Sequence, residues 1–345
     1  MRAPALILAL SLAGCGPDYP PVIWSGEHIE YATERDRDIC EGSFVLQDEF
    51  VGLLSEFVGV TLSEPALFVY VEQEKLGDFC PREWAAGCSY EYAAISTKAL
   101  NRHELAHVVT RSAGWNGPAS FVEGVAEMFN DGVDLDEVRE PIDAVLDDFQ
   151  ITDTHYFTMG LFVRFLVERH GLEKLAAFMR DTDYHAARET YEATFAQHFG
   201  ESLSDATAAF DDYPTCPEWS NRIALYECNL PLTPWSNGAI DVNVDLQCED
   251  SDVFGPLEDD PMRIGSFVAF EVEVEETYSV EVNSEIAGFA GVRITRCGSC
   301  WDEVDFGVVA GEPESATLPP GRYYATFVAD VSSPGQIDLH LSPMP

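Results

Sequence analysis

Positive charge is scarce in this chain. Only 19 lysine and arginine residues stand against 61 aspartate and glutamate residues, which gives a formal net charge of −42. A surface of that sign repels both phosphate backbones and anionic membrane surfaces. Nucleic acid is therefore not an expected partner, and the charge is typical of the solvated surface of an exported protein.

Long hydrophobic runs are scarce as well. The apolar run over residues 3–12 follows Arg2 and is too short to span a bilayer, which is typical of a secretion signal. The next residues, Leu12-Ala13-Gly14-Cys15, resemble the lipobox of bacterial lipoproteins. This resemblance implies a signal peptide over residues 1–14 and lipid attachment at Cys15, and Gly16 favours the outer membrane. An ordinary signal peptide with an incidental Cys15 stays open.

Cysteine is present in an even number once Cys15 is set aside. An even number in an exported protein predicts disulfides in an oxidising compartment, with Cys80–Cys88 and Cys216–Cys228 as plausible local pairs. The Cys297-Gly-Ser-Cys300 segment has no second C-x-x-C and no histidine pair nearby, so disulfides are favoured there over a zinc ribbon or a redox motif. The eight cysteines are Cys40, Cys80, Cys88, Cys216, Cys228, Cys248, Cys297 and Cys300.

The pentapeptide His103-Glu104-Leu105-Ala106-His107 carries the most specific chemical pattern. On a helix the two histidines are about 40° apart, so both imidazoles project from one face. In the H-E-x-x-H pattern such histidines bind Zn²⁺, and the glutamate acts as general base on a water that the metal binds. Two histidines stacked by chance on a surface are the alternative, which an apolar stripe on the same helix disfavours.

A catalytic zinc needs a third protein ligand, which a second helix supplies. Its core side carries Phe121 and Val125, and Glu123 and Glu127 lie four residues apart on its other side. The segment 121–127 resembles the gluzincin metallopeptidases. The resemblance implies that Glu123 completes the zinc site and that Glu127 orients a zinc-bound histidine. Exchanged roles, or two purely structural glutamates, stay open.

A strongly apolar helix is expected over residues 154–170, with Tyr156 near its start. Its Tyr-x-x-x-Gly-x-Phe pattern is also similar to gluzincin-type domains. Tyr156 can donate a hydrogen bond to the oxyanion that develops during hydrolysis, and His155 is a weaker candidate for that role. The alternative is a packed tyrosine whose hydroxyl reaches the surface.

The patterning predicts an α+β fold. Strands at residues 66–71 and 90–95 and helices at 43–58 and 97–112 come first, followed by helices at 172–180, 184–198 and 203–211. From residue 235, short alternating strands predict a β-sandwich that resembles the jelly-roll modules of secreted bacterial peptidases. The expected units are a signal peptide (1–14), a tether (15–26), a gluzincin-like domain of mixed sheet and helices (27–213), a Cys/Pro-rich connector (214–234) and the sandwich (235–345).

Together these features predict a lipid-anchored, exported zinc metallopeptidase, with an endopeptidase slightly favoured. The expected partners are a peptide or protein substrate and, through the N-terminal anchor alone, a bilayer. A non-catalytic binding lipoprotein that keeps the peptidase scaffold is the alternative. Whether the cleaved peptide bonds belong to proteins or to cell-wall material is left open by the sequence.

Overall fold

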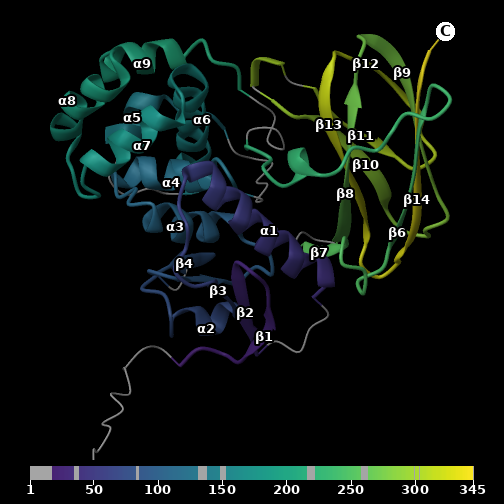
Figure 1. Ribbon diagram of the computed structural model, residues 1–345, viewed down its shortest axis with the longest axis horizontal. Helices are drawn as coiled ribbons and strands as arrows, with labels where there is room; N and C mark the ends of the chain where they lie inside the picture. Colours follow the sequence, from purple (N-terminus) through teal and green to yellow (C-terminus); the bar gives the residue numbers. More distant parts are fainter. Residues whose placement is uncertain are drawn as a thin grey trace, which may run out of the picture.

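The computed structural model describes residues 18–34, 39–82, 85–130, 138–147, 153–215, 222–257, 263–298, 300–302 and 304–344. Helices and strands are mixed, so the α+β expectation is confirmed. Figure 1 shows one part that combines a small sheet with helices and a second part made of strands. The predicted signal peptide and Cys15 lie outside the described residues.

A five-stranded mixed sheet begins the first part, in the order β1-β2-β3-β5-β4. β3 is parallel to both of its neighbours, and all five of its residues are buried, as expected for a central parallel strand. β4 pairs antiparallel with β5 and is the last strand of the sheet. The strands are β1 (Val22–Ser25), β2 (Ile29–Thr33), β3 (Ala66–Tyr70), β4 (Gly87–Ser89) and β5 (Ala93–Ser96).

Helices pack against this sheet and against one another around one large apolar core. α1 lies across the sheet, and α3 and α4 lie next to it (Figure 1). α6 is buried along most of its length and contacts α4, α5 and α7. The helices are α1 (Glu41–Val58), α2 (Gln73–Leu76), α3 (Arg102–Ser112), α4 (Ala119–Glu127), α5 (Ile142–Asp147), α6 (Asp153–His170), α7 (Leu172–Asp181), α8 (Arg188–Phe199) and α9 (Leu203–Phe210).

The second part is a β-sandwich with its own core. One sheet has the order β11-β10-β13-β8-β7 and the other β12-β9-β14-β6, and every pairing in them is antiparallel. Apart from β7, this is the strand order of a jelly roll. The strands are β6 (Ile240–Leu246), β7 (Phe254–Leu257), β8 (Arg263–Val272), β9 (Glu276–Ser284), β10 (Ala290–Arg296), β11 (Asp305–Val309), β12 (Glu314–Leu318), β13 (Gly321–Asp330) and β14 (Gly335–Pro343).

The two parts are joined by bonds as well as by packing. The N-terminal end of α1 reaches β7, where the hydroxyl of Ser43 exchanges hydrogen bonds with the backbone of Gly255. A Cys40–Cys248 disulfide fixes the same end of α1 to the sandwich. The short helix η1 (Glu227–Asn229) is bonded to the sandwich by Cys228–Cys297.

The disulfides confirm one predicted pair and correct another. Cys80 pairs with Cys88, as expected. The pair Cys216–Cys228 was wrong because Cys228 lies next to the sandwich and bonds to Cys297; Cys216 is outside the described residues. Because Cys300 is also disulfide-bonded, the 297–300 segment is not a metal or redox motif. Disulfides of this number indicate an oxidising, extracytoplasmic compartment.

Three predicted boundaries also differ from the structure. The segment expected as one strand at residues 90–95 is part of a hairpin. Residues 93–95 belong to β5, and the exposed Tyr90 and Tyr92 lie in the connection between β4 and β5. The helix expected from Thr97 begins at Arg102, and α5 was not foreseen. β1 lies within the expected tether and pairs with β2. Within the described ranges, no helix combines the length and the apolar character needed to cross a bilayer.

Candidate metal centre

Helix α3 holds the pentapeptide, and a side-chain cap fixes where this helix starts. The side chain of Asn101 accepts a hydrogen bond from the backbone N–H of Glu104 at 3.1 Å and donates one to Ser96 Oγ at 3.0 Å. An asparagine cap satisfies an N–H group that has no partner within the helix. Strand β5 and helix α3 are thereby tied together, and the first helical turn carries both His103 and Glu104.

Three side chains from α3 and α4 converge on one point. His103 Nε2, His107 Nε2 and Glu123 Oε2 form a triangle in which each atom lies 3.2 Å from the other two. These side chains are mostly buried, with exposed fractions of 14%, 8% and 18%. The structure therefore brings together the three predicted metal ligands, and within the described residues they form a group able to hold a metal ion.

Glu127 contacts the other side of the His103 ring. Its Oε2 lies 3.2 Å from His103 Nδ1 and accepts a hydrogen bond from the Asn130 side-chain amide at 3.0 Å. A carboxylate facing Nδ1 favours the tautomer that carries its proton there, which leaves the Nε2 lone pair directed at the triangle. In this geometry Glu123 belongs to the triangle, whereas Glu127 orients His103.

The triangle fits a tetrahedral zinc ion. Ligand atoms bound at about 2.0–2.1 Å in tetrahedral geometry lie about 3.3–3.4 Å apart, close to the 3.2 Å observed. Two imidazole nitrogens and one carboxylate oxygen are also the donor set of many catalytic zinc sites. Without a cation or a proton between them, two nitrogen lone pairs and a carboxylate would face one another in a buried place, which is costly.

Burial and these contacts shift the pKa values of the site. Burial alone would lower the pKa of His103, but its hydrogen bonds to Glu123 and Glu127 outweigh burial and raise the pKa well above its ordinary value. Burial would raise the pKa of Glu123, but the neighbouring histidines hold it far below its usual range. For Glu104, burial prevails over the two histidines and raises the pKa. The ion-free triangle thus favours a proton on His103 and a charged Glu123, and a cation would replace that proton.

Glu104 lies beside the triangle and against strand β4. It is 8% exposed, and a Cβ added at Gly87 would lie 2.9 Å from Glu104 Cγ and 2.6 Å from the Ile95 carbonyl oxygen. Glycine at position 87 is therefore what allows the Glu104 side chain to approach the strand so closely. Both Gly87 and Glu104 line the same cavity as the metal group.

Tyr156 belongs to the site and His155 does not. The Tyr156 ring packs edge-on against His103 with ring centroids 5.6 Å apart, and Tyr156 lines the cavity. His155 instead places its Nδ1 2.8 Å from a carboxylate oxygen of Glu140. Of the two candidates for the oxyanion donor, only Tyr156 lines the cavity.

The cavity in front of the triangle has a volume of 580 Å³, within the range of small-molecule and peptide sites. The lining residues that sequence reasoning did not find include Asn101, Arg111, Asn130 and Tyr184. Arg111 follows His107 by four residues on the same helix, so helical spacing contained a signal for it. Tyr184 comes from the loop after α7, and no local pattern connects it to α3.

Comparisons with known proteins leave the family open. No protein-family model matches the chain, and no curated protein matches it. A cycloisomaltooligosaccharide glucanotransferase from Paenibacillus sp., complexed with cycloisomaltoheptaose, is 15% identical, with a TM-score of 0.16 over 23% of this chain and 13% of that one. The enzymatically active domain of bacteriophage CBA120 tailspike protein 4 is 11% identical, with a TM-score of 0.19 over 31% and 20%.

A third solved structure, the iron(II) enzyme HppE with its substrate, is 10% identical, with a TM-score of 0.15 over 59% of this chain and 99% of that one. The chain spans about an eighth and a fifth of the length of the first two proteins. Scores this low reflect only locally similar segments, so the function has to be argued from the site itself.

Proposed function

We propose that this protein is an exported zinc metallopeptidase of the gluzincin type. The observation that carries the proposal is the triangle of His103, His107 and Glu123, whose atoms lie 3.2 Å apart, with Glu104 buried beside it. A structural zinc site would use four protein ligands, whereas three leave a position for water. The two ligand helices and the adjoining mixed sheet are also what a zincin-like domain requires.

The chemistry follows from the charges and donors around this position. Zinc in a three-ligand site acts as a Lewis acid and lowers the pKa of water to about 7. Glu104 is placed to accept the proton of the attacking water and to pass it to the leaving amine. Burial raises the pKa of Glu104, which makes its carboxylate a stronger base for the first of these steps.

Tyr156 supplies the second polar contact with the reacting carbonyl in this proposal. Its ring is held edge-on against His103 at the wall of the cavity, which fixes the direction of the phenol group. A phenol hydroxyl at that wall donates a hydrogen bond to the oxygen on which negative charge develops. His103 is thus oriented from two sides, by Glu127 and by Tyr156.

A peptide substrate is favoured by strand β4. β4 is the last strand of its sheet, and Gly87, Cys88 and Ser89 line the cavity. Within the part of the chain that the structure describes, no strand pairs with its outer edge. An extended peptide can add to such an edge through backbone hydrogen bonds, which would place one of its carbonyl groups in front of the triangle.

Replacement of Glu104 by glutamine tests this proposal. Glu104→Gln keeps the size of the side chain and removes the base, so we expect the variant to retain one zinc per chain and to lose peptide hydrolysis by at least about 100-fold. The measurements are metal content by elemental analysis and cleavage of a peptide library with a chelator control. Glu173→Gln, at an exposed position of α7, is the matched control and should keep both properties.

Full hydrolysis by Glu104→Gln would contradict the mechanism. The alternative of a non-catalytic binding lipoprotein predicts a different result, because protein purified with zinc available would then contain no stoichiometric metal. Lipid attachment at Cys15 is a separate part of the proposal. It predicts that Cys15→Ser releases the protein from the membrane fraction.

A further inference from the structure

Three basic residues line the cavity of the metal centre. Arg82, Lys98 and Arg111 line it, out of 19 lysine and arginine residues in a chain with 61 acidic ones. The acidic residues that line the same cavity are Glu104, Glu123 and Glu127, and the metal centre accounts for all three. Among the described residues that line this cavity, the charged groups outside the metal centre are therefore all basic.

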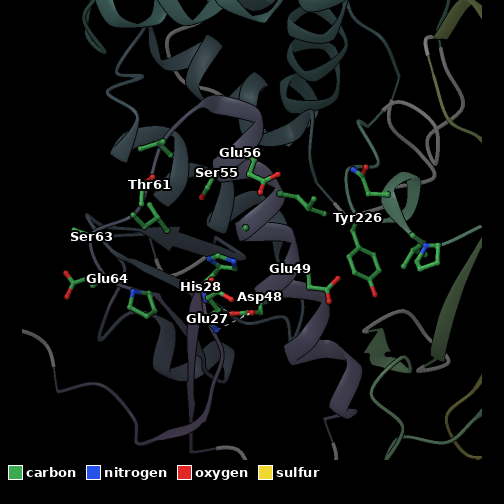
Figure 2. Close-up of a pocket in the computed structure, with 18 residues that line it drawn as sticks. Glu27, His28, Asp48, Glu49, Ser55, Glu56, Thr61, Ser63, Glu64 and Tyr226 are labelled. Atoms are coloured by element: carbon green, nitrogen blue, oxygen red, sulfur yellow. Dashed lines mark hydrogen bonds between the residues drawn. The ribbon is translucent and has the colours of Figure 1, made fainter.

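A second cavity differs from the first in the charged residues that line it. The 810 Å³ groove between α1 and the connector is lined by Glu27, Asp48, Glu49, Glu56 and Glu64. No lysine or arginine of the described residues lines it. Figure 2 shows Glu49 on α1 with its carboxylate toward Tyr226. The overall acidity of the chain dominates this groove, whereas the metal centre departs from it.

Arg111 is the basic residue that the structure fixes best. It lies on α3 one turn beyond His107, a rise of about 6 Å along the helix. Its Nη2 donates a hydrogen bond to Ser89 Oγ on β4 at 3.2 Å, so the guanidinium bridges the metal helix and the strand that borders the cavity. Arginine keeps further N–H groups available when one of them is used in this way.

Arg82 and Tyr184 also line the cavity. Burial and the charge of Glu123 raise the pKa of the Tyr184 hydroxyl, and both Arg82 and Arg111 act in the opposite direction. Planar guanidinium groups bind carboxylates through paired hydrogen bonds, and a phenol hydroxyl can add a third.

We propose that Arg111 binds a substrate carboxylate, so that the enzyme prefers acidic peptides. The inference rests on the proposed function, because it names the substrate class of that same site. An extended peptide advances about 3.3 Å per residue, and Arg111 lies about 6 Å beyond His107, so the carboxylate belongs within about two residues of the scissile bond. It is either an Asp or Glu side chain or the C-terminal carboxylate.

The strongly negative surface does not oppose this preference at the site. At physiological ionic strength charges are screened beyond about 8 Å, so a docked carboxylate responds mainly to the groups that line the cavity. The competing explanation is that the basic residues only balance the carboxylates of the metal centre, as the effect of Arg111 on the pKa of Glu104 suggests. In that case every substrate would depend on Arg111 equally.

Matched peptides on the unmodified zinc-loaded protein provide the first test. Peptides that differ only by Glu or Gln at each of the two positions on either side of the scissile bond are compared, as are free-acid and amidated C-termini. We expect kcat/KM to be about 10-fold higher for one of these carboxylates. The position at which the preference appears distinguishes a side-chain carboxylate from a terminal one.

Binding provides a second readout that does not require turnover. Labelled acidic and amide peptides are titrated against Glu104→Gln, with zinc and without it, and their dissociation constants are measured by fluorescence anisotropy. Arg111→Gln in this background should reduce the acid-to-amide ratio to about one- to threefold, Arg111→Glu should invert it, and Arg111→Lys should restore part of it. Lys75→Gln, which removes a positive charge on exposed α2, is the control and should leave the ratio unchanged.

The outcomes separate the two proposals. Hydrolysis and binding without an acid preference would overturn the carboxylate site and leave the peptidase proposal intact. Preferential binding of acidic peptides without hydrolysis of any peptide would support the carboxylate site and overturn the peptidase proposal. An equal loss for acidic and neutral peptides in Arg111→Gln, or an equal effect of Lys75→Gln, would also overturn the carboxylate site.

Discussion

At the scale of single residues, His103 has the most constrained environment in the described structure of the site. Carboxylates face both of its ring nitrogens, Glu123 at Nε2 and Glu127 at Nδ1, each at 3.2 Å. The two glutamates look alike in the sequence, since they lie four residues apart on one helix. Their contacts differ, because only Glu123 also lies 3.2 Å from His107.

This difference predicts unequal effects on metal affinity. Glu127→Gln should raise the zinc dissociation constant by about 10- to 100-fold, because loss of the carboxylate loosens the orientation of His103. Glu123→Gln should raise it further, because a ligand is lost. Competition against a chromogenic chelator measures both constants, with Glu173→Gln as the control. A larger effect for Glu127→Gln would instead indicate that Glu127 is the metal ligand and that Glu123 orients the histidine.

The H-E-x-x-H residues could be predicted from the sequence because their chemistry depends on local helical spacing. The position of Glu123 was predicted only through the resemblance to a family, and Arg111 was missed although it lies on the same helix. An arginine on a helix surface is usually solvated, so its helical spacing from His107 was not enough by itself to assign it to the site. Only the strand that meets α3 turns Arg111 toward the cavity.

At the scale of elements, close packing of α4 on α6 fixes both glutamates. A Cβ at Gly124 would lie 2.7 Å from the Met159 backbone carbonyl oxygen, and a Cβ at Gly160 would lie 2.9 Å from Glu127 Cγ. Contacts this short leave no room for a side chain at either position. Glycine is therefore needed at position 124, directly after Glu123, because α6 packs closely against α4 there.

Gly124→Ala should accordingly displace α4. Because the new methyl group meets backbone rather than a movable side chain, we expect a loss of about 1–3 kcal/mol in the free energy of unfolding and weaker zinc binding. Denaturant unfolding and the chelator titration measure the two effects. Gly307→Ala is the control, because a Cβ there meets no heavy atom within 4 Å. Unchanged stability in Gly124→Ala would contradict this prediction, because it would mean that α6 can move away from the new methyl group at little cost.

Most elements were predicted with the right type, and the errors have local causes. Asn101 caps α3 and so shortens the expected helix from its N-terminal side. Tyr90 and Tyr92 favour a strand by composition, but the backbone turns between them so that β4 and β5 can pair. The positions of turns and helix caps depend on competition between side-chain-to-backbone hydrogen bonds and those of secondary structure. An apolar pattern does not show which of these bonds will form.

At the scale of the whole molecule, a buried charge network connects the metal helix to the connector. Glu227 is fully buried and accepts hydrogen bonds from Arg102, the first residue of α3, and from Arg222, both at 3.0 Å. Burial would raise the pKa of Glu227, but the two arginines prevail and lower it. Next to it, Cys228 is bonded to the sandwich. The start of the metal helix is thus fixed from the C-terminal half.

This network predicts a pH-dependent contribution to stability. A folded-state pKa below the unfolded value of about 4.3 stabilises the fold above that pH, and the stabilisation is lost as pH falls through the folded pKa. Glu227→Gln leaves two buried arginines without their anion, so we expect a loss of about 3–5 kcal/mol at pH 7. The difference from the unmodified protein should shrink as the solution is acidified.

Denaturant unfolding at several pH values measures this difference, again with Glu173→Gln as the control. A constant difference from pH 7 to pH 3 would contradict the ion-pair explanation. The network, the Cys40–Cys248 bond and the contact of α1 with β7 together show that the sandwich supports the metal-binding half. The sequence predicted the two domains but not these contacts between them, because contacts between distant segments leave no periodic pattern in the sequence.

The sequence by itself determined the paired histidines with their glutamate, the α+β class and an oxidising compartment. These follow from local spacing, from periodicity and from cysteine content, which the chain carries without being folded. Only the tertiary structure decided that Glu123 rather than Glu127 joins the histidines, that Cys228 bonds to Cys297, and that Arg111 lines the cavity of the metal centre. Each of these depends on which distant surfaces pack together, and packing is a property of the whole chain.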